Sequence, residues 1–478
     1  MRLPNPSLLL RAFVSWPVVH GLGLIGGLAW FFLGYSIPET TSAWYSGDPH
    51  YYVAQSLTKP KDLFFHSHWR TFGYPFYLSS FRQFFPGEST WRLPAFLLQF
   101  LCYLGSCWFL IFALRRHGTK VPSVVVALMF AHPALAGISG LPMSEPLATA
   151  SVSSALATTI LLLNNGRLLV LRALLIGGFL GVALCIRPQM LAFLGVFIGF
   201  VGAVVGLLKY YATKRFIPAG FAFILFFVVS AGTFYPCVRH LLNNCMRSYN
   251  TFCLIEPGLA QSAMRESILF KATRIWYTPL PIPESAVLCK NVPWPIVFGD
   301  CELSRTDFLG ELLMCYKRHY KEIPLIFAER LVGSFDNRHI HPYAGKETST
   351  RESFVIRCFS IVTLIGAAAA LVIWLCSLGH GEALRKSYLL LPLVYIGAQI
   401  NFHPEPRYYY PIFPLLFICG MSSLITNQFA RRWQRVVFLV SSVAITFYYT
   451  TKVVEWDSEI IEPVCKTDYN RLYKPTGQ

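Results

Sequence analysis

Residues 173–208 read ALLIGGFLGVALCIRPQMLAFLGVFIGFVGAVVGLL, two apolar runs separated only by Arg187-Pro188-Gln189. An α-helix rises about 1.5 Å per residue, so a run of about 20 apolar residues crosses the roughly 30 Å hydrocarbon core of a bilayer. Comparable runs recur along the whole 478-residue chain. We therefore expect an all-α integral membrane protein with many spans.

The composition points to the same class of protein. Hydrophobic residues make up 54% of the chain and charged residues only 14%, with a mean hydropathy of +0.47. Soluble domains carry about a quarter charged residues, and these values also exclude intrinsic disorder, collagen and a small disulfide scaffold. The sequence has no Walker motif, G-x-S-x-G or H-E-x-x-H, so nucleotide-driven transport and the common hydrolases lack support.

Windows of about 19 residues predict about eleven spans. They lie near Val18–Ile37, Leu93–Leu114, Val121–Leu141, Leu147–Leu163, Ala173–Ile186, Met190–Leu208, Phe216–Tyr235, Phe354–Leu375, Tyr388–Ile400, Pro411–Ile425 and Val436–Thr451. The first span lacks an A-x-A cleavage site before Pro38, so we expect it to stay as an anchor.

Lysine and arginine in the segments between spans predict the orientation of the chain. One alternating set of segments carries Arg2, Arg11, Arg115, Arg116, Lys120, Arg167, Arg172, Lys209, Lys214, Arg215, Arg385, Lys386, Arg431, Arg432 and Arg435. The positive-inside rule places this set and the N-terminus in the cytoplasm. Topology then explains much of the net charge of +17, and no nucleic-acid partner is expected.

This orientation divides the chain into four parts. They are an N-terminal transmembrane module (1–235) with a first outer loop at about 38–92, a large extracytoplasmic loop (236–353), C-terminal transmembrane helices (354–452) and an extracytoplasmic tail (453–478). Loops as long as these two are usually functional.

Of the 13 cysteines, those placed outside the cytoplasm are Cys237, Cys245, Cys253, Cys289, Cys301, Cys315 and Cys465. An oxidising compartment would permit disulfides within the second loop, and independent packing cysteines fit equally well.

The first outer loop opens with Trp44-Tyr45-Ser46-Gly47-Asp48-Pro49-His50-Tyr51-Tyr52. An acid at the outer end of a span, inside an aromatic cluster, meets both a lipid substrate and a water-soluble hydroxyl. Partial burial there would make the Asp48 carboxylate a usable base. The alternative is structural, because Asp48-Pro49 is also a good helix start.

A second cluster in this loop reads His66-Ser67-His68-Trp69-Arg70-Thr71-Phe72-Gly73-Tyr74-Pro75. The planar guanidinium of Arg70 is suited to gripping a phosphate, although a snorkelling interfacial cation takes the same position. His66 and His68 could bind a metal, but no nearby carboxylate or thiol completes such a site. His339 and His341 form a second histidine pair, and their segment fits a loop that closes over substrate better than it fits a metal site. We expect no metal and no other cofactor.

Two short outer turns carry ionisable residues at the mouths of spans. Glu145 follows Ser144 in one turn, and Arg187 precedes Pro188 in the other. Such groups are costly at this depth and usually face a cavity or each other, so both are candidates for a substrate site. A purely structural Glu145–Arg187 ion pair is the alternative.

The last outer turn, Asn401-Phe402-His403-Pro404-Glu405-Pro406-Arg407-Tyr408-Tyr409-Tyr410-Pro411, is the densest in polar groups. A carboxylate, a guanidinium and three tyrosines at the mouth of a span are suited to binding a sugar and its phosphate together. An ordinary interfacial belt explains the tyrosines alone. The full set of substrate-binding candidates is His50, Arg70, Tyr74, Glu145, Arg187, His403, Glu405, Arg407 and Tyr408.

In order and spacing, these pieces resemble the GT-C glycosyltransferases. The branch that they resemble uses polyprenyl-phosphate sugars and includes protein O-mannosyltransferases, aminoarabinose transferases and bacterial lipopolysaccharide-core transferases. The matching pieces are Asp48-x-x-Tyr51-x-x-Ala54, Arg70-Thr71-Phe72-Gly73-Tyr74-Pro75, Ser144-Glu145, Arg187-Pro188, and Glu405-x-Arg407-Tyr408 with Pro411 and Pro414. The second outer loop matches nothing in this family.

The resemblance implies a role for each match. Asp48 would be the base for the acceptor, Arg70 would lie near the donor phosphate, and the donor pocket would be lined by Glu405, Arg407 and Tyr408. Many relatives have a second acid directly after the aspartate, where this chain has Pro49 and His50. That difference puts a second carboxylate, and any metal that it would hold, in doubt.

We therefore expect a GT-C-type bundle that transfers a sugar, with inversion, from a polyprenyl-phosphate donor to a hydroxyl of a lipid, glycan or protein acceptor. Because the chain has no N-x-S/T sequon with x other than Pro, the expected location is a bacterial inner membrane with a periplasmic active site; the endoplasmic reticulum is the alternative. Two other functions stay open: a flippase or transporter of lipid-linked glycans, and a non-catalytic scaffold with a transferase-like fold.

Overall fold

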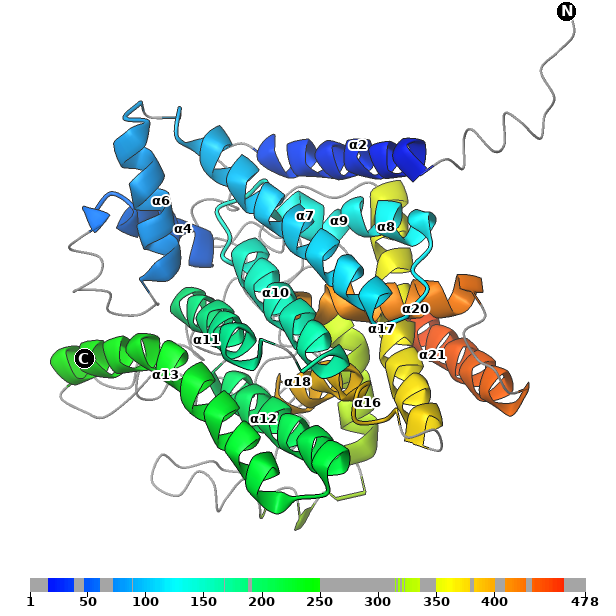
Figure 1. Cartoon of the computed structure of the whole chain (residues 1–478). Helices are drawn as coiled ribbons and strands as arrows, with labels where there is room; N and C mark the ends of the chain where they lie inside the picture. Colours follow the sequence, from blue (N-terminus) through cyan, green and yellow to red (C-terminus); the bar gives the residue numbers. More distant parts are fainter. Residues whose placement is uncertain are drawn as a thin grey trace, which may run out of the picture.

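The computed structural model describes residues 16–37, 47–60, 72–87, 89–166, 168–187, 191–249, 314, 317–318, 320–321, 323–335, 350–378, 382–399, 409–426 and 432–459. Within these ranges the chain is helical and contains no strand (Figure 1). The predicted all-α class is confirmed for this part of the protein.

The elements are α2 (Trp16–Tyr35), α4 (Gly47–Gln55), α6 (Gly73–Phe84), α7 (Arg92–Arg116), α8 (Ser123–Phe130), α9 (Pro133–Ile138), α10 (Glu145–Asn164), α11 (Leu169–Ile186), α12 (Leu191–Thr213), α13 (Phe216–Tyr249), α16 (Ile323–Phe335), α17 (Thr350–Leu378), η3 (Ser387–Leu390), α18 (Leu391–Gln399), η4 (Tyr410–Ile412), α20 (Phe413–Thr426) and α21 (Arg432–Glu459). Among the described residues, 7 helices are long and apolar enough to cross a membrane: α2, α7, α10, α11, α12, α13 and α17. These seven helices indicate an integral membrane protein. The other predicted spans coincide with shorter apolar segments and with α21, so the full count of spans stays a prediction.

The predicted span at 121–141 consists of two short helices. α8 ends at Phe130 and α9 begins at Pro133, and His132 between them has an extended backbone with φ −62° and ψ 112°. Proline has no backbone N–H, and it disfavours the helical conformation in the residue before it. The helix therefore breaks at His132, and both pieces pack against α2.

α10 lies between α7 and α11 near the centre of the bundle (Figure 1). Inside the protein, 83% of its apolar stretch is buried, the largest share among the seven long apolar helices. Its sequence is rich in alanine, serine and threonine, and small residues allow helix backbones to approach closely in a membrane. The hydroxyls of Ser151 and Thr159 donate to carbonyl oxygens one turn earlier, at 2.8 and 2.9 Å. These hydroxyls therefore need no partner on a neighbouring helix.

α13 is the least buried of the seven long apolar helices, with 22% of its apolar stretch buried inside the protein. Large exposed side chains follow its length: Phe216, Ile217, Phe221, Ile224 and Val228. A soluble monomer rarely exposes a continuous apolar surface of this kind, whereas the acyl chains of a bilayer would cover it. The helix continues through Pro236 to Tyr249, so the first residues of the predicted second outer loop are helical.

Two glycines set the contact between α17 and α20. A Cβ added to Gly366 would lie 1.9 Å from the carbonyl oxygen of Leu416, and one added to Gly420 would lie 2.5 Å from that of Val362. No side chain fits in so little space, and the two helices approach this closely because both positions are glycine.

We predict that Gly366→Ala lowers the free energy of unfolding by about 1–3 kcal/mol, because the added methyl forces the two backbones apart. Gly105→Ala in α7 is the matched control, since an added Cβ there has nothing within 4 Å, and alanine is the better helix former by about 0.5–1 kcal/mol. Thermal unfolding in detergent, followed by tryptophan fluorescence, measures both variants. Equal stability of Gly366→Ala and wild type would contradict this packing.

Candidate active site

α4 carries the acidic motif of the first outer loop. It begins at Gly47 and holds Asp48 and Pro49 in its first turn, where proline costs little because the N–H groups of that turn have no partner within the helix. The structure describes the backbone of Asp48 and His50, and their side chains lie outside the described part. Residues four apart lie on the same face of a helix, so Asp48 shares its face of α4 with Tyr52.

Tyr52 fixes this face of α4 to two other helices. Its ring is buried and packs edge-on against the ring of Tyr74 in α6, with 4.9 Å between the ring centroids. Its hydroxyl oxygen lies 3.1 Å from Oγ of Ser144, just before α10, and either group can donate this hydrogen bond. The helix that carries Asp48 is thereby held against α6 and the start of α10.

Tyr74 is fully buried and hydrogen-bonded. Its hydroxyl donates to Oε1 of Gln99 in α7 at 3.1 Å, and Nε2 of Gln99 donates to the carbonyl oxygens of Ser139 at 2.6 Å and Leu141 at 2.8 Å. Burial raises the pKa of the Tyr74 hydroxyl well above its usual value, and the nearby Tyr77 and Glu145 raise this pKa further. Tyr74 therefore stays neutral and serves as a hydrogen-bond donor.

Glu145 and Arg187 form a buried ion pair. The guanidinium Nη1 of Arg187 lies 2.7 Å from Oε1 of Glu145, and the two side chains are only 4% and 1% exposed. Glu145 is in the first turn of α10, and Arg187 directly follows the last residue of α11. Each charge is at the helix end whose dipole favours it, since anions are stabilised at N-termini and cations at C-termini. The ion pair that the sequence suggested as a structural alternative is formed.

Gly73 brings α6 against the end of α11. A Cβ at this position would lie 2.5 Å from the carbonyl oxygen of Cys185, so only glycine allows Tyr74 to reach its place in the core. The preceding residue, Phe72, packs edge-on against His240 of α13, with 4.5 Å between ring centroids. The start of α6 is therefore in contact with both α11 and α13.

The structure brings three of the predicted site residues into one buried cluster. Tyr74, Glu145 and Arg187 come together, with Asp48 on the adjoining helix α4. Outside the described residues lie Arg70, His403, Glu405, Arg407 and Tyr408. The residue after this last group, Tyr409, is buried beside Phe335 and Tyr395, and η4 directly after it packs against α10. The last outer turn thus ends beside the helix that carries Glu145.

Sequence reasoning missed two members of the cluster, Tyr52 and Gln99. Tyr51 and Tyr52 come three and four residues after Asp48, so the helical period places both near its face of α4 and does not choose between them. Gln99 is an amide inside an apolar stretch that is otherwise suited to crossing the membrane, and polar groups in such places usually pair with each other or with backbone. The signal for Gln99 is therefore present in the sequence, whereas the choice of Tyr52 depends on packing against α6.

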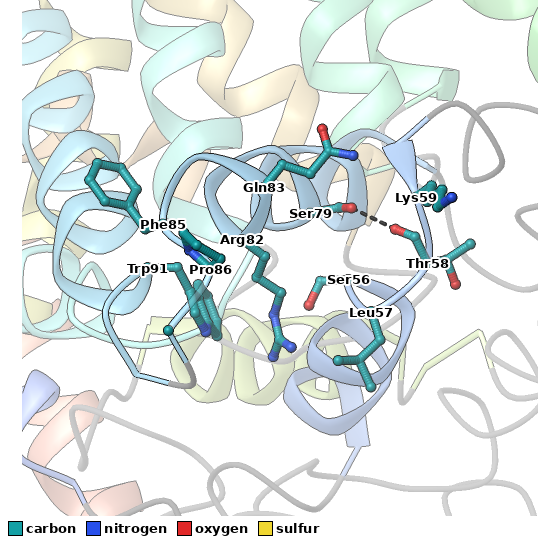
Figure 2. Close-up of a pocket in the computed structure, with 11 residues that line it drawn as sticks. Ser56, Leu57, Thr58, Lys59, Ser79, Arg82, Gln83, Phe85, Pro86 and Trp91 are labelled. Carbon is teal, nitrogen blue, oxygen red and sulfur yellow. Dashed lines mark hydrogen bonds between the residues drawn. The ribbon is translucent and has the colours of Figure 1, made fainter.

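A cavity of about 420 Å³ lies between the end of α4, the last turns of α6 and the start of α7. Figure 2 shows Arg82 reaching from α6 towards the end of α4, beside Trp91; its guanidinium lies 4.4 Å from the centroid of the Trp91 ring. The wall combines polar and cationic groups with apolar ones: Ser56, Thr58, Lys59, Ser79, Arg82 and Gln83 with Leu57, Phe85, Pro86, Gly87 and Trp91. Ser79 donates to the carbonyl oxygen of Thr58 at 2.5 Å and joins α6 to the end of α4. The cavity suits a ligand with both an apolar face and negative charge.

Within the described part of the chain, no three histidine, cysteine, aspartate or glutamate side chains come together as a metal site. The histidine pairs at 66 and 68 and at 339 and 341 lie outside the described residues.

We predict that Arg187→Met destabilises the protein by about 3–5 kcal/mol, because it leaves the Glu145 carboxylate buried without its guanidinium. The double variant Glu145→Leu/Arg187→Met should recover a large part of this loss, since neither charge is then buried. Lys386→Met is the matched control: it removes a partly exposed pair with Glu382, also at 2.7 Å, which is worth at most about 1 kcal/mol. Thermal unfolding gives all three values, and a double variant no more stable than Arg187→Met would contradict the ion-pair interpretation.

Comparison with known proteins adds no relative from which a function can be carried over. No family model matches the chain, and neither the curated proteins nor the solved structures include a match to it.

Proposed function

We propose that this chain is a GT-C-type membrane glycosyltransferase that moves a sugar from a polyprenyl-phosphate donor to an acceptor hydroxyl at the extracytoplasmic face. The observation that carries the proposal is the convergence of sequence pieces that are far apart in the chain. Tyr52 of the Asp48 helix contacts Tyr74 and Ser144, and Ser144 immediately precedes the Glu145 that pairs with Arg187. Four of the pieces that resemble the family thus have residues in one buried cluster.

The proposed reaction is a single displacement. Asp48 takes the proton of the acceptor hydroxyl, whose oxygen attacks the anomeric carbon from the face opposite the phosphate. The bond between the anomeric carbon and the phosphate oxygen breaks, and polyprenyl phosphate leaves, so the configuration is inverted. Arg70 and Arg407 stabilise the charge that grows on the departing phosphate, a contribution of about 2.7–4 kcal/mol for one well-placed donor.

The ion pair and the tyrosines have a positioning role in this proposal. Because Glu145 and Arg187 neutralise each other at 2.7 Å, they supply rigidity rather than net charge. Tyr52 and Tyr74 hold α4 by its inward face, and Asp48 is on the same face one turn earlier. A base on so short a helix keeps its direction only if the helix is fixed at several points.

The cavity beside α4 is the proposed site for the acceptor. Its first wall residue, Ser56, directly follows the last residue of α4. A rise of about 1.5 Å per residue places this end about 12 Å from Asp48. That distance suits an acceptor headgroup of more than one sugar, with Phe85 as an apolar surface and with Lys59 and Arg82 for its negative charge.

We predict that Asp48→Asn reduces sugar transfer by at least about 10³-fold, because the amide cannot accept the proton of the acceptor, while expression and donor binding stay unchanged. The assay incubates purified protein with radiolabelled polyprenyl-phosphate sugars and membrane acceptors. Glu382→Gln, which alters an exposed carboxylate far from the cluster in sequence, is the matched control. Unchanged turnover in Asp48→Asn would remove Asp48 from the mechanism, and movement of label across vesicles without transfer would favour a flippase.

We predict that Lys59→Gln raises the KM for an anionic acceptor about 3- to 10-fold with little change in kcat, because it removes charge that binds substrate and transition state equally. The KM for the donor should not change. Lys120→Gln, on the predicted cytoplasmic side, is the charge-matched control. An unchanged acceptor KM in Lys59→Gln would exclude the cavity as the acceptor site.

A further inference from the structure

Small residues line the contact between α11 and α13. Ala173, Gly177, Gly181 and Cys185 follow one another at intervals of four and therefore lie along one face of α11. A Cβ on Gly177 would lie 2.3 Å from the carbonyl oxygen of Ser230, whose hydroxyl donates to the carbonyl oxygen of Ala173 at 3.1 Å. The two helices are thus packed backbone to backbone, and this leaves little freedom in where their ends lie.

Two cysteines meet at one end of this contact. A Cβ on Gly181 would lie 3.2 Å from Sγ of Cys237, and Cys185 lies one turn beyond Gly181 on the same face of α11, near enough for the two thiols to influence each other. Both are thiols in the structure. A disulfide requires the two sulfur atoms to approach to about 2.05 Å with compatible Cβ directions, and two thiols that are neighbours across closely packed helices are placed for such a bond.

The positions of the two thiols along their helices place them at one face of the membrane. α11 and α13 are separated in the chain by α12 alone, so they cross the bilayer in the same direction. Cys185 is next to the last residue of α11, and Cys237 comes after most of the apolar length of α13. Both therefore lie at the same membrane face, which is the extracytoplasmic face in the orientation given by the positive-inside rule. Extracytoplasmic compartments are oxidising and permit disulfides.

We propose that Cys185 and Cys237 form a structural disulfide that joins the ends of α11 and α13. Its formation removes two protons and two electrons from the two thiols and creates one S–S bond. The electrons pass to the disulfide of an extracytoplasmic thiol–disulfide oxidoreductase, which is reduced to a dithiol. The bond rests on the proposed membrane orientation but not on glycosyl transfer.

This bond lies directly behind the start of α6. The carbonyl oxygen of Cys185 is the atom against which Gly73 packs, and Phe72 contacts His240 in the turn after Cys237. Arg187 is two residues beyond Cys185 and forms the buried ion pair. A covalent link between the two helices therefore fixes the surface on which Tyr74 and Arg187 are positioned.

The direct test is peptide mapping of full-length protein from membranes. The protein is denatured in acid, alkylated with N-ethylmaleimide without reductant, digested and analysed by mass spectrometry. The expected result is a peptide pair linked through Cys185 and Cys237 that disappears on reduction, with both thiols alkylated only after reduction. Alkylation of both thiols before reduction, or linkage of Cys237 to another cysteine, would overturn the proposal. No sugar substrate is involved, so the result is independent of whether the protein transfers sugar.

A second measurement tests the structural role of the bond. Dithiothreitol should lower the Tm of wild type by several degrees, and this reductant-dependent fall should be smaller in Cys185→Ser and in Cys237→Ser. Cys102→Ser, in the half-buried α7 position, is the matched control and should keep the full reductant-dependent fall. Equal falls in all four proteins would show that no stabilising bond joins Cys185 and Cys237.

Discussion

The ion pair between Glu145 and Arg187 is the contact on which the cluster depends. Removing a carboxylate and a guanidinium from water costs several kcal/mol for each ion, and this cost is offset only while the two groups stay in contact. The start of α10 and the end of α11 are therefore held at one separation. Tyr52 is hydrogen-bonded to Ser144 at the start of α10, and Tyr74 is hydrogen-bonded to Gln99 in the neighbouring α7. The short helices α4 and α6 thus take their positions from a contact between two long ones.

Close packing of the helices allows this buried cluster to form. Polar groups within a bilayer must find partners inside the protein, and they do so only if the backbones approach closely. Gly73 permits this approach for α6 and α11, and the small side chains of α10 permit it for α7 and α11. Hydrophobic burial alone would not select this arrangement, because lipid chains are as apolar as leucine. Steric fit around small residues decides it.

Much of the architecture could be predicted because the hydrocarbon core admits long apolar helices and little else. Glu145 and Arg187 were also predictable, since charged residues at the mouths of apolar spans are rare and costly. The break at His132 was hidden within an apolar run, although Pro133 marks it. The cavity was not predictable, because Lys59 and Arg82 come from separate elements, and local spacing does not say that α6 folds back beside the end of α4. Which tyrosine of the Asp48 motif faces inward likewise depends on the helix that covers it.

The charge balance of the cluster bears on how the proposed site would hold its donor. A phosphate monoester or diester carries one to two negative charges, and a pocket that binds it must supply uncompensated cations. Arg187 does not supply one, because Glu145 lies 2.7 Å from it. In the proposed site the cation therefore comes from Arg70, which precedes Phe72 and Gly73 by two and three residues in the sequence. In this proposal the neutral pair fixes the geometry, and Arg70 provides the charge.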